Sequence, residues 1–564
     1  MEARGITPGP LFAIPGPFVV TLAWKGSNML NHFSTSLRWI TLVLTGSLLL
    51  VAGVATATPP AIQVHQSEPT TAEELSIAIN PANPSVLAAG ANINYHFRST
   101  DGGASWTEHH LSSPLGVWGD PCVVFDADGN LYYSHLAYPQ GGSWLDRIVV
   151  QKSTDGGMTW SDGVGVGHNP PKDQDKSIMT ADRTGSPYRN NLYIAWTEFD
   201  TYGSSSTTDS TRILFSRSDD QGFSWSAPLR ISDLGGNCLD EDETVEGATP
   251  AVGPEGQVYL AWSGHEQIYF DRSFDGGATF GNDFVVSSQP GGWAFYVPGL
   301  YRCNGMPITV CDRSSSPYRG RVYVVFSDQR NGTDDTDVFI CSSDDRGSTW
   351  SLPQRVNDDV GAAHQFFPWV TVDPLTGIVA VVFYDRRNTS GDATEVTVAV
   401  SLDGGGTFTN TIVSDSAFTP IDSVFFGDYI GIDSWDGVIY AIWMTMDAGE
   451  LGVWMAKLAI PSGVHSGSGF LAETTLMMKA TSTTTSRRTK ISFTTYHDSQ
   501  VRLSIYDLRG RLIQSLVSES RIAGRYTEMW EGTDRTGAKV ASGMYVVHLQ
   551  AGQDVVTRKV VIVN

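Results

Sequence analysis

Apolar residues occur along most of this chain in short runs that end at Gly, Asp or Asn. Examples are "GQVYLAWSG" (256–264), "GIVAVVFYD" (377–385) and "GVIYAIWM" (437–444). Such runs, rich in β-branched and aromatic residues and separated by turn residues, predict short β-strands. Apolar spacing typical of helices is scarce, so we expect an all-β protein.

One eight-residue phrase recurs six times and fits Ser-x-Asp-x-Gly-x-x-Trp/Phe. Its copies are "STDGGASW" (99–106), "STDGGMTW" (153–160), "SDDQGFSW" (218–225), "SFDGGATF" (273–280), "SDDRGSTW" (343–350) and "SLDGGGTF" (401–408). Their aspartates are Asp101, Asp155, Asp220, Asp275, Asp345 and Asp403. In a hairpin turn the Asp accepts backbone hydrogen bonds, the Gly allows a positive φ and the aromatic ring anchors the turn. We therefore interpret the phrase as a structural turn.

A larger unit surrounds each phrase: a strand, a Gly-containing turn, a second strand ending in an aromatic residue, a third strand, the phrase and a short fourth strand. Repeats of this length with four antiparallel strands predict the blades of a β-propeller. Seven units begin near Leu75, Asp120, Ser177, Thr249, Met306, Phe367 and Asp428. The seventh has only three strands, and we expect "AIQVHQS" (61–67) to supply its fourth. A six-bladed ring with an irregular extra piece is the alternative.

The repeated phrase and its context resemble the Asp-box, or BNR, repeats of the sialidase-like propeller superfamily. The resemblance covers about residues 61–461, and it implies that the boxes lie at the periphery of the blades, away from any catalytic centre. We therefore assign residues 58–461 to the propeller.

The chain composition changes after Pro461. Residues 462–488 are rich in Ser, Thr and Gly and predict a linker, whereas alternating strands return over 489–564 and predict a small β-sandwich. Residues 505–507 (Ile-Tyr-Asp), 530–532 (Trp-Glu-Gly) and 558–560 (Arg-Lys-Val) resemble the FlgD-type Ig-like domain, which overlaps the type IX secretion sorting domains. The resemblance implies attachment to the bacterial surface through outer-membrane secretion machinery. The usual Asn-Pro start is absent, and a merely stabilising sandwich is the alternative.

The N-terminal residues predict export. "WITLVLTGSLLLVAGVA" (39–55) follows Arg38 and is followed by small residues, which predicts a signal peptide cleaved after Ala57. A membrane anchor is the alternative, and Met29 is a candidate start residue. We expect a secreted or cell-surface protein, with residues 1–57 forming an extension and signal.

The net charge and the cysteine content limit the classes of partner and ligand that we expect. Lys and Arg number 37 and Asp and Glu 60, a net charge of -23, which disfavours binding to nucleic acid. The five cysteines have no zinc-site spacing and leave at least one thiol unpaired. We expect a monomer that binds a glycan or glycoprotein.

Candidate chemistry lies where the first strand of each unit begins, because propellers bind ligands over the central channel. These positions carry Glu73 and Glu74, Asp120, Asp175 and Lys176, Glu246, Asn304 and Asp428. Converging carboxylates suit a calcium ion or sugar hydroxyls, although we expect no cofactor. A structural role in a wet channel is the alternative.

The sialidase resemblance implies three arginines on a substrate carboxylate, an acidic residue as acid/base and a Tyr–Glu nucleophile pair. Candidates here are Arg147, Arg330 and Arg386 for the arginines, with Arg302 and Arg387 also available, Asp120 or Asp175 for the acid, and Tyr429 or Tyr296 with Glu246 for the pair. The Phe-Arg-Ile-Pro motif of true sialidases is absent, so no arginine is assigned by motif. An Asp–Arg clamp within "FSDQR" (326–330) and "FYDRR" (383–387) is the structural interpretation of Arg330 and Arg387.

Two functions remain open from the sequence, besides the weaker alternative of a purely structural surface protein. The first is an exo-α-sialidase or related glycosidase, which requires catalytic carboxylates around one channel mouth. The second is a non-catalytic propeller that binds glycans or proteins at the cell surface.

Overall fold

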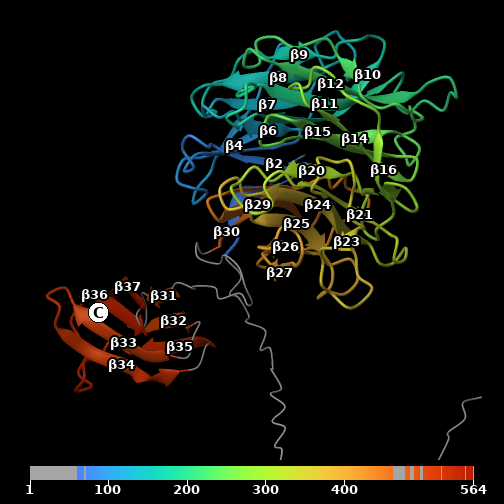
Figure 1. The fold of residues 1–564 in the computed structure, drawn as a ribbon. Helices are drawn as coiled ribbons and strands as arrows, with labels where there is room; N and C mark the ends of the chain where they lie inside the picture. The colour runs from blue at the N-terminus through green and yellow to red at the C-terminus, as the bar shows by residue number, and fades with distance from the viewer. Residues whose placement is uncertain are drawn as a thin grey trace, which may run out of the picture. The chain divides into compact units, whose positions relative to one another are not determined.

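The computed structural model describes residues 60–68, 72–460, 477–482, 488–495, 499–521, 524–552 and 554–562 (Figure 1). The predicted extension and signal peptide lie outside these residues. The described part is built from β-strands and turns and contains no α-helix. Within it, no helix is long and apolar enough to cross a membrane.

Six four-stranded antiparallel sheets follow one another along the chain, each with its strands in sequence order. Their strands are β2 (Ser76–Ile79), β3 (Leu87–Ala91), β4 (Tyr95–Ser99) and β5 (Thr107–His110); β6 (Cys122–Phe125), β7 (Leu131–Leu136), β8 (Ile148–Ser153) and β9 (Val164–Val166); β10 (Asp173–Ala181), β11 (Leu192–Phe199), β12 (Thr211–Ser218) and β13 (Leu229–Arg230); β14 (Glu246–Val252), β15 (Val258–Gly264), β16 (Gln267–Ser273) and β17 (Phe284–Ser288); β20 (Ile308–Cys311), β21 (Val322–Asp328), β22 (Asp337–Ser343) and β23 (Gln354–Arg355); β24 (Gln365–Val372), β25 (Val379–Asp385), β26 (Glu395–Ser401) and β27 (Thr409–Ile412).

A seventh sheet joins the two ends of this region. Its order is β1-β30-β29-β28, with β28 (Gly431–Trp435), β29 (Val438–Asp447), β30 (Glu450–Ala459) and β1 (Ile62–Glu68). Ile62 pairs with Met455 and His65 with Val453, so the predicted closing strand is confirmed. The first strands contact one another in a ring in which β28 meets β2. Seven sheets in a closed ring form a β-propeller, and closure leaves no free edge between the termini.

The core lies between neighbouring sheets. The second strands carry large aromatic residues at 0 or 1% exposure, among them Trp196, Trp262 and Trp443. Each packs among aliphatic and aromatic side chains of its own sheet and of a neighbouring sheet. The apolar runs of the second strands are buried on both faces, because each propeller sheet is covered by a neighbouring sheet on two sides.

The repeated phrase forms the turn between the third and fourth strands. In the first copy, Asp101 Oδ1 accepts hydrogen bonds from Ser99 Oγ (2.9 Å) and Ser105 N (2.9 Å), and its Oδ2 accepts one from Ser105 Oγ (2.6 Å). The same three bonds recur at Asp155, Asp220, Asp275, Asp345 and Asp403. Hydrogen bonds from Ser105 and Ser99 lower the pKa of Asp101 to about 2. These aspartates are therefore occupied within their own turns.

Each of the six turns also receives a cation from the preceding sheet. Arg98 Nε of the first sheet donates to Gly156 O of the second turn (2.7 Å), and Lys457 Nζ of the seventh donates to Gly102 O of the first (2.9 Å). The other four donors are Lys152, Arg217, Arg272 and Arg321. The turns thus fasten neighbouring sheets together, which explains why they recur around the ring.

We predict that Arg98→Met lowers the free energy of unfolding by about 1 kcal/mol, because it removes one charge-assisted hydrogen bond between sheets and keeps the apolar stem. The measurement is urea unfolding followed by tryptophan fluorescence. Arg346→Met is the matched control: Arg346 is exposed, and a change there should stay within about 0.5 kcal/mol. Equal effects of the two substitutions would contradict the fastening role.

One element interrupts the repeating order of four-stranded sheets. A two-stranded sheet of β18 (Ala294–Phe295) and β19 (Cys303–Asn304) is inserted between β17 and β20.

All five cysteines are buried and free of disulfides, so neither Cys303 nor Cys311 is bridged.

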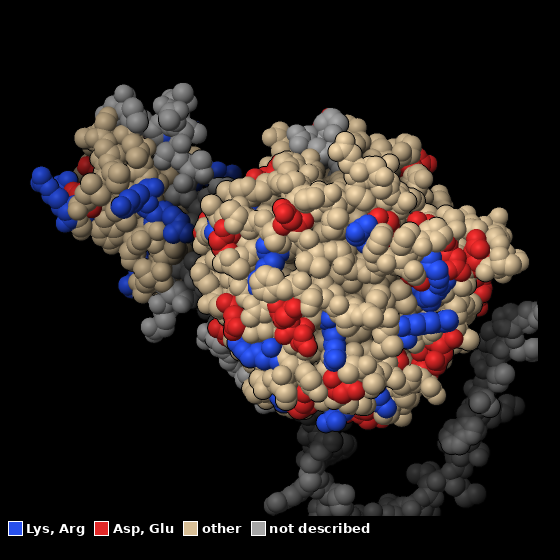
Figure 2. Space-filling model, turned by 90° about the horizontal axis from the view of Figure 1, so that it is seen from above, with Lys and Arg blue, Asp and Glu red and all other residues tan. Residues whose placement is uncertain are grey.

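Acidic and basic side chains are interspersed on the propeller face seen in Figure 2. The net charge of -23 is therefore not gathered into one acidic patch on that face.

The C-terminal part is a β-sandwich of two sheets. Its core includes Trp530 and Ile505 at 0% exposure and Tyr545 at 8%. The three-stranded sheet has the order β31-β32-β35 and the four-stranded sheet β34-β33-β36-β37. The strands are β31 (Met477–Ser482), β32 (Thr489–Thr495), β33 (Ser499–Asp507), β34 (Leu512–Arg521), β35 (Gly524–Trp530), β36 (Gly543–Ala551) and β37 (Asp554–Ile562).

The first strand of the sandwich lies inside the segment predicted as a linker. β31 pairs with β32 from Met477 opposite Thr494 to Ser482 opposite Thr489. The linker prediction over 462–488 was therefore wrong at its C-terminal end. Ser and Thr suggest a linker by composition, but Thr is also a good strand residue where a partner strand is present.

Candidate active site at the mouth of the central channel

Charged side chains converge where the first strands begin. Glu74, Asp120, Lys176 and Phe367, immediately before or within these strands, adopt positive φ angles of 59°, 51°, 52° and 49°. β-Bulges occur at the same level of β10, β14 and β24. Backbone strain of about 1–3 kcal/mol per residue persists only where the surroundings fix it, and it is common at functional sites.

Lys176 is the centre of this cluster. Its ammonium group pairs with Asp428 and lies 3.7 Å from Glu74 Oε1 and 3.8 Å from Asp120 Oδ2. The three carboxylates come from three different sheets, and Lys176 is only 8% exposed. Their charges raise the pKa of Lys176 well above its ordinary value despite burial, so the side chain stays cationic.

Arg302 covers the cluster from the inserted β18–β19 segment. Its guanidinium forms a two-pronged ion pair with Asp428, and its Nη1 lies 3.2 Å from Asp240 Oδ2. The same Asp240 oxygen accepts a hydrogen bond from Tyr202 Oη (2.6 Å). Burial opposes the charged form of Asp428, but Arg302 and Lys176 hold its pKa below the ordinary value.

Other carboxyl groups of the cluster are driven toward the protonated form. Burial and the charge of Asp120 raise the pKa of Asp175 to about 8. Burial raises the pKa of Glu73 to about 7. Burial and the neighbouring Asp240 raise the pKa of Glu246 well above its ordinary value. The mouth therefore contains carboxyl groups in both protonation states at neutral pH.

Several oxygens of the cluster have no hydrogen-bond donor. Both carboxyl oxygens of Glu246 and the Oδ2 atom of Asp120 are buried and receive none. Asn92 holds the neighbouring groups in place, because its Nδ2 donates to Glu74 Oε2 (2.5 Å) and its Oδ1 accepts from Asp120 N (2.8 Å). Asp120 is thus fixed through its backbone while one carboxylate oxygen remains available.

Aromatic rings border the mouth. Tyr202, which bonds Asp240, packs edge-on against Trp144 at 5.5 Å, and Trp144 is 40% exposed. Arg302 lies over the Phe425 ring at 4.9 Å, and Phe425 packs against the exposed Tyr301. Exposed aromatic faces beside carboxylates and a guanidinium suit a ligand that has both apolar faces and hydroxyl groups.

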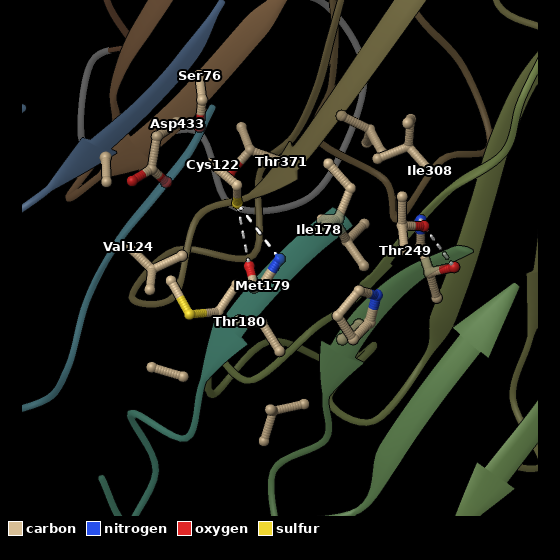
Figure 3. Close-up of a pocket in the computed structure, with 18 of the residues that line it drawn as sticks. Ser76, Cys122, Val124, Ile178, Met179, Thr180, Thr249, Ile308, Thr371 and Asp433 are labelled. Atoms are coloured by element: carbon tan, nitrogen blue, oxygen red, sulfur yellow. Dashed lines mark hydrogen bonds between the residues drawn. The ribbon is translucent and has the colours of Figure 1, made fainter. Parts of the chain in front are cut away.

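The channel continues below the cluster. A small cavity of about 40 Å³ lies between Asp120, Lys176 and Trp369. A larger one of about 160 Å³ follows, lined by first-strand residues such as Ile178, Thr249 and Ile308 (Figure 3). Among the described residues, no three His, Cys, Asp or Glu side chains are placed to hold a metal ion together.

The structure brings four predicted catalytic residues to the mouth. Asp120 and Asp175 interact electrostatically with each other and with Lys176, and Glu246 interacts with Asp175. Tyr429 lies beside Glu74 and Asp120, and its hydroxyl donates to Pro121 O (3.3 Å).

The predicted nucleophile pair, Tyr429 and Glu246, is not joined by a hydrogen bond. Tyr429 has no hydrogen bond to Glu246 among the described residues, and burial raises its pKa well above the ordinary value. The alternative residue Tyr296 is 70% exposed and lies beside Arg386.

The three predicted arginines occupy three separate loops. Each follows the second strand of its sheet and is bound outside the cluster: Arg147 by Asp146 (2.7 Å), Arg330 by Asp328 (2.5 Å), and Arg386 by Thr394 Oγ1 (3.0 Å) in its own loop and Pro298 O (2.8 Å) in the inserted segment. No described residue contacts two of them. The Asp–Arg clamp expected in "FYDRR" is also present, since Arg387 Nε lies 2.6 Å from Asp385 Oδ2.

Sequence reasoning missed Asp240 and Tyr202 and gave no specific role to Arg302, which it counted only among the available arginines. Tyr202 lies in a loop of the third sheet, Asp240 in the connection between β13 and β14, and Arg302 in the inserted segment. The sequence shows them only as loop residues, and their role depends on contacts across the ring. The absence of a local acidic partner for Arg302 in "LYRCNG" (300–305) was the one available signal.

Comparison with known proteins gives matches to both parts of the architecture. The FlgD Ig-like domain family matches residues 479–554. A sialidase of Micromonospora viridifaciens is 27% identical over 223 residues, which cover 34% of this chain and 32% of that protein. The chain thus matches about a third of the length of this curated relative.

Solved structures resemble the chain over a larger share. An α-L-arabinofuranosidase of Fusarium graminearum has a TM-score of 0.42 at 12% identity, covering 71% of this chain and 98% of that one. An α-L-arabinanase of Penicillium chrysogenum has a TM-score of 0.39 at 13% identity, covering 71% and 98%. The chain thus forms a β-propeller that is similar to a sialidase over about a third of its length, followed by a domain that matches the FlgD Ig-like family.

Proposed function

We propose that this protein is an exported glycan-acting propeller that hydrolyses glycosidic bonds at the channel mouth. The proposal is supported by the similarity to a sialidase and by the carboxyl groups that converge around Lys176 and Arg302. The apolar stretch over 39–55 and the FlgD Ig-like domain support export and attachment to the cell surface.

One observation carries the catalytic part: Asp120 and burial raise the pKa of the adjacent Asp175 to about 8. Glycosidases use one protonated carboxyl group to protonate the leaving oxygen and one carboxylate as base or nucleophile. Asp175 is suited to the first role. Asp120, with an unpartnered Oδ2 3.8 Å from Lys176 Nζ, is suited to the second.

The remaining groups are suited to binding and orientation. The ring of Trp144 can cover an apolar sugar face, while Arg302 and Asp240 can hydrogen-bond hydroxyl or carboxylate groups. Arg302 is the guanidinium within this cluster, whereas Arg147, Arg330 and Arg386 are bound by groups outside it. We therefore favour a glycoside substrate that a single arginine can orient, and not a substrate whose carboxylate requires three arginines.

A non-catalytic glycan-binding propeller is the second candidate. It is favoured by the burial of the cluster, since Glu74 is 1% exposed, Glu246 0% and Asp428 5%. Asp428 is also fully committed to Arg302 and Lys176. In this case the exposed Trp144 and Tyr301 would bind sugar without bond cleavage.

We predict that Trp144→Ala weakens glycan binding at least tenfold in both cases, because it removes an exposed ring at the mouth. A panel of fluorogenic glycosides measures turnover, and a glycan array with isothermal titration calorimetry measures affinity. Phe223→Ala is the matched control, since Phe223 is 74% exposed and lies in the third repeated turn. Turnover supports the hydrolase, and retention on the array without turnover supports the binding protein. Absence of both turnover and retention overturns the proposal.

A further inference from the structure

Two arginines lie at the opposite end of the channel, where the first strands finish. Arg183 follows β10 and Arg313 follows β20, in matching segments "DRTGSPYR" (182–189) and "DRSSSPYR" (312–319). Both side chains line the cavity of about 160 Å³, together with Asp433 of β28. Figure 3 shows Asp433, Thr371 and Ser76 around this part of the channel.

Asp182 and Asp312, which precede these arginines in sequence, form no ion pair with them. Both carboxylates instead accept hydrogen bonds within their own loops. Asp182 accepts hydrogen bonds from Thr184 N (2.7 Å) and Ser186 Oγ (2.6 Å). Asp312 accepts the equivalent bonds from Ser314 N (2.7 Å) and Ser316 Oγ (2.6 Å). These bonds fix both loops and leave the guanidinium groups directed into the cavity.

No hydrogen bond or ion pair is formed by either guanidinium within the described part of the chain. Asp433, the third charge, is held by Ile79 N (2.9 Å) and Ser434 N (2.8 Å). Arg183 and Arg313 also repel each other, and with burial this lowers the pKa of Arg313 to about 10, which leaves it charged at neutral pH. Two cations thus face one carboxylate in a confined space.

We propose that Arg183 and Arg313 bind one tetrahedral oxyanion, phosphate or sulfate, at this end of the channel. A guanidinium presents paired N–H donors that match phosphate or sulfate oxygens, and two such groups that line one cavity can hold one dianion between them. A cavity of about 150 Å³ holds a molecule the size of benzene, so the space is sufficient. The proposal does not depend on the function of the other mouth.

Isothermal titration calorimetry of the full chain with inorganic phosphate and with inorganic sulfate, at constant ionic strength set by sodium chloride, tests this site. We expect one site per chain, at least tenfold weaker in Arg183→Gln and in Arg313→Gln and lost in the double variant. Arg313→Lys should retain part of the affinity, because it keeps the charge and loses the paired donors.

Arg346→Gln is the control, since Arg346 is an exposed arginine in the fifth repeated turn and does not line the cavity. Its affinity should equal that of the unaltered protein. A further titration with a sulfated monosaccharide distinguishes a free anion from an esterified one. Absence of binding of all three ligands, or unchanged binding in a double variant with an unaltered circular dichroism spectrum, overturns the proposal.

Discussion

Asp175→Asn is expected to reduce glycoside hydrolysis by about 10²–10⁴-fold, the usual contribution of a general acid. The amide preserves the size of the side chain and can still accept the hydrogen bond from Lys176 N (2.8 Å), but it has no proton to give to the leaving oxygen. The measurement is kcat/KM on a substrate identified in the glycoside panel. Asp128→Asn, at an exposed carboxylate paired with Arg189, is the control and should leave kcat/KM unchanged.

The leaving group separates an acid from a merely structural residue. A dinitrophenyl glycoside departs without protonation, so Asp175→Asn should affect it far less than a methyl glycoside. Asp120→Asn, which removes the proposed base or nucleophile, should affect both substrates alike. If Asp175→Asn lowered the two rates equally, the general-acid role would be wrong.

The pH dependence gives an independent check of the same residue. Asp175 is protonated below its pKa of about 8 and ionised above it, so activity should fall as pH rises past about 8. In Asp175→Asn this alkaline decline should be absent from the residual activity. A decline that persists in the variant would assign the titration to another group.

The sequence predicted the propeller well because its signals are local. The phrase around Asp101 specifies a turn through residues within four positions of the aspartate, and "AIQVHQS" has the alternation of a strand without a partner of its own. The site was predicted only in part, for the opposite reason. Glu74, Asp120 and Asp428 lie at repeated first-strand positions, whereas Arg302 and Asp240 reach the mouth from loops whose course depends on the folded ring.

The ion pairs of Lys176 were harder to predict than its position at the start of a strand. Lys176 was visible at the start of a first strand, but only the closed ring places Asp428, distant in sequence, against its ammonium group. Protonation states follow from burial and proximity together, so the raised pKa of Glu246 cannot be predicted from sequence spacing.

Lys176→Met is expected to lower the free energy of unfolding of the propeller by about 3–5 kcal/mol at pH 8, because removing one partner leaves buried carboxylates uncompensated. Asp428 would keep Arg302, so the penalty would arise mainly at Asp120 and Glu74. The measurement is urea unfolding followed by tryptophan fluorescence. Lys172→Met is the matched control: Glu198 and Asp200 would retain Arg212, and the loss should stay below about 1 kcal/mol.

The pH dependence of this loss identifies its cause. Lys176 has a raised pKa, so its contribution is fully present below the ordinary value of 10.5 and is constant between pH 5 and 8. The carboxyl groups differ: the pKa of Glu74 is raised in the fold, so it accepts a proton as pH falls and its negative charge is relieved. The destabilisation by Lys176→Met should therefore be smaller at pH 5 than at pH 8, and Glu74→Gln in the same chain should recover part of it at pH 8. A loss independent of pH, unaffected by Glu74→Gln, would indicate that Lys176 acts through packing, because its charge would then be unnecessary to the cluster.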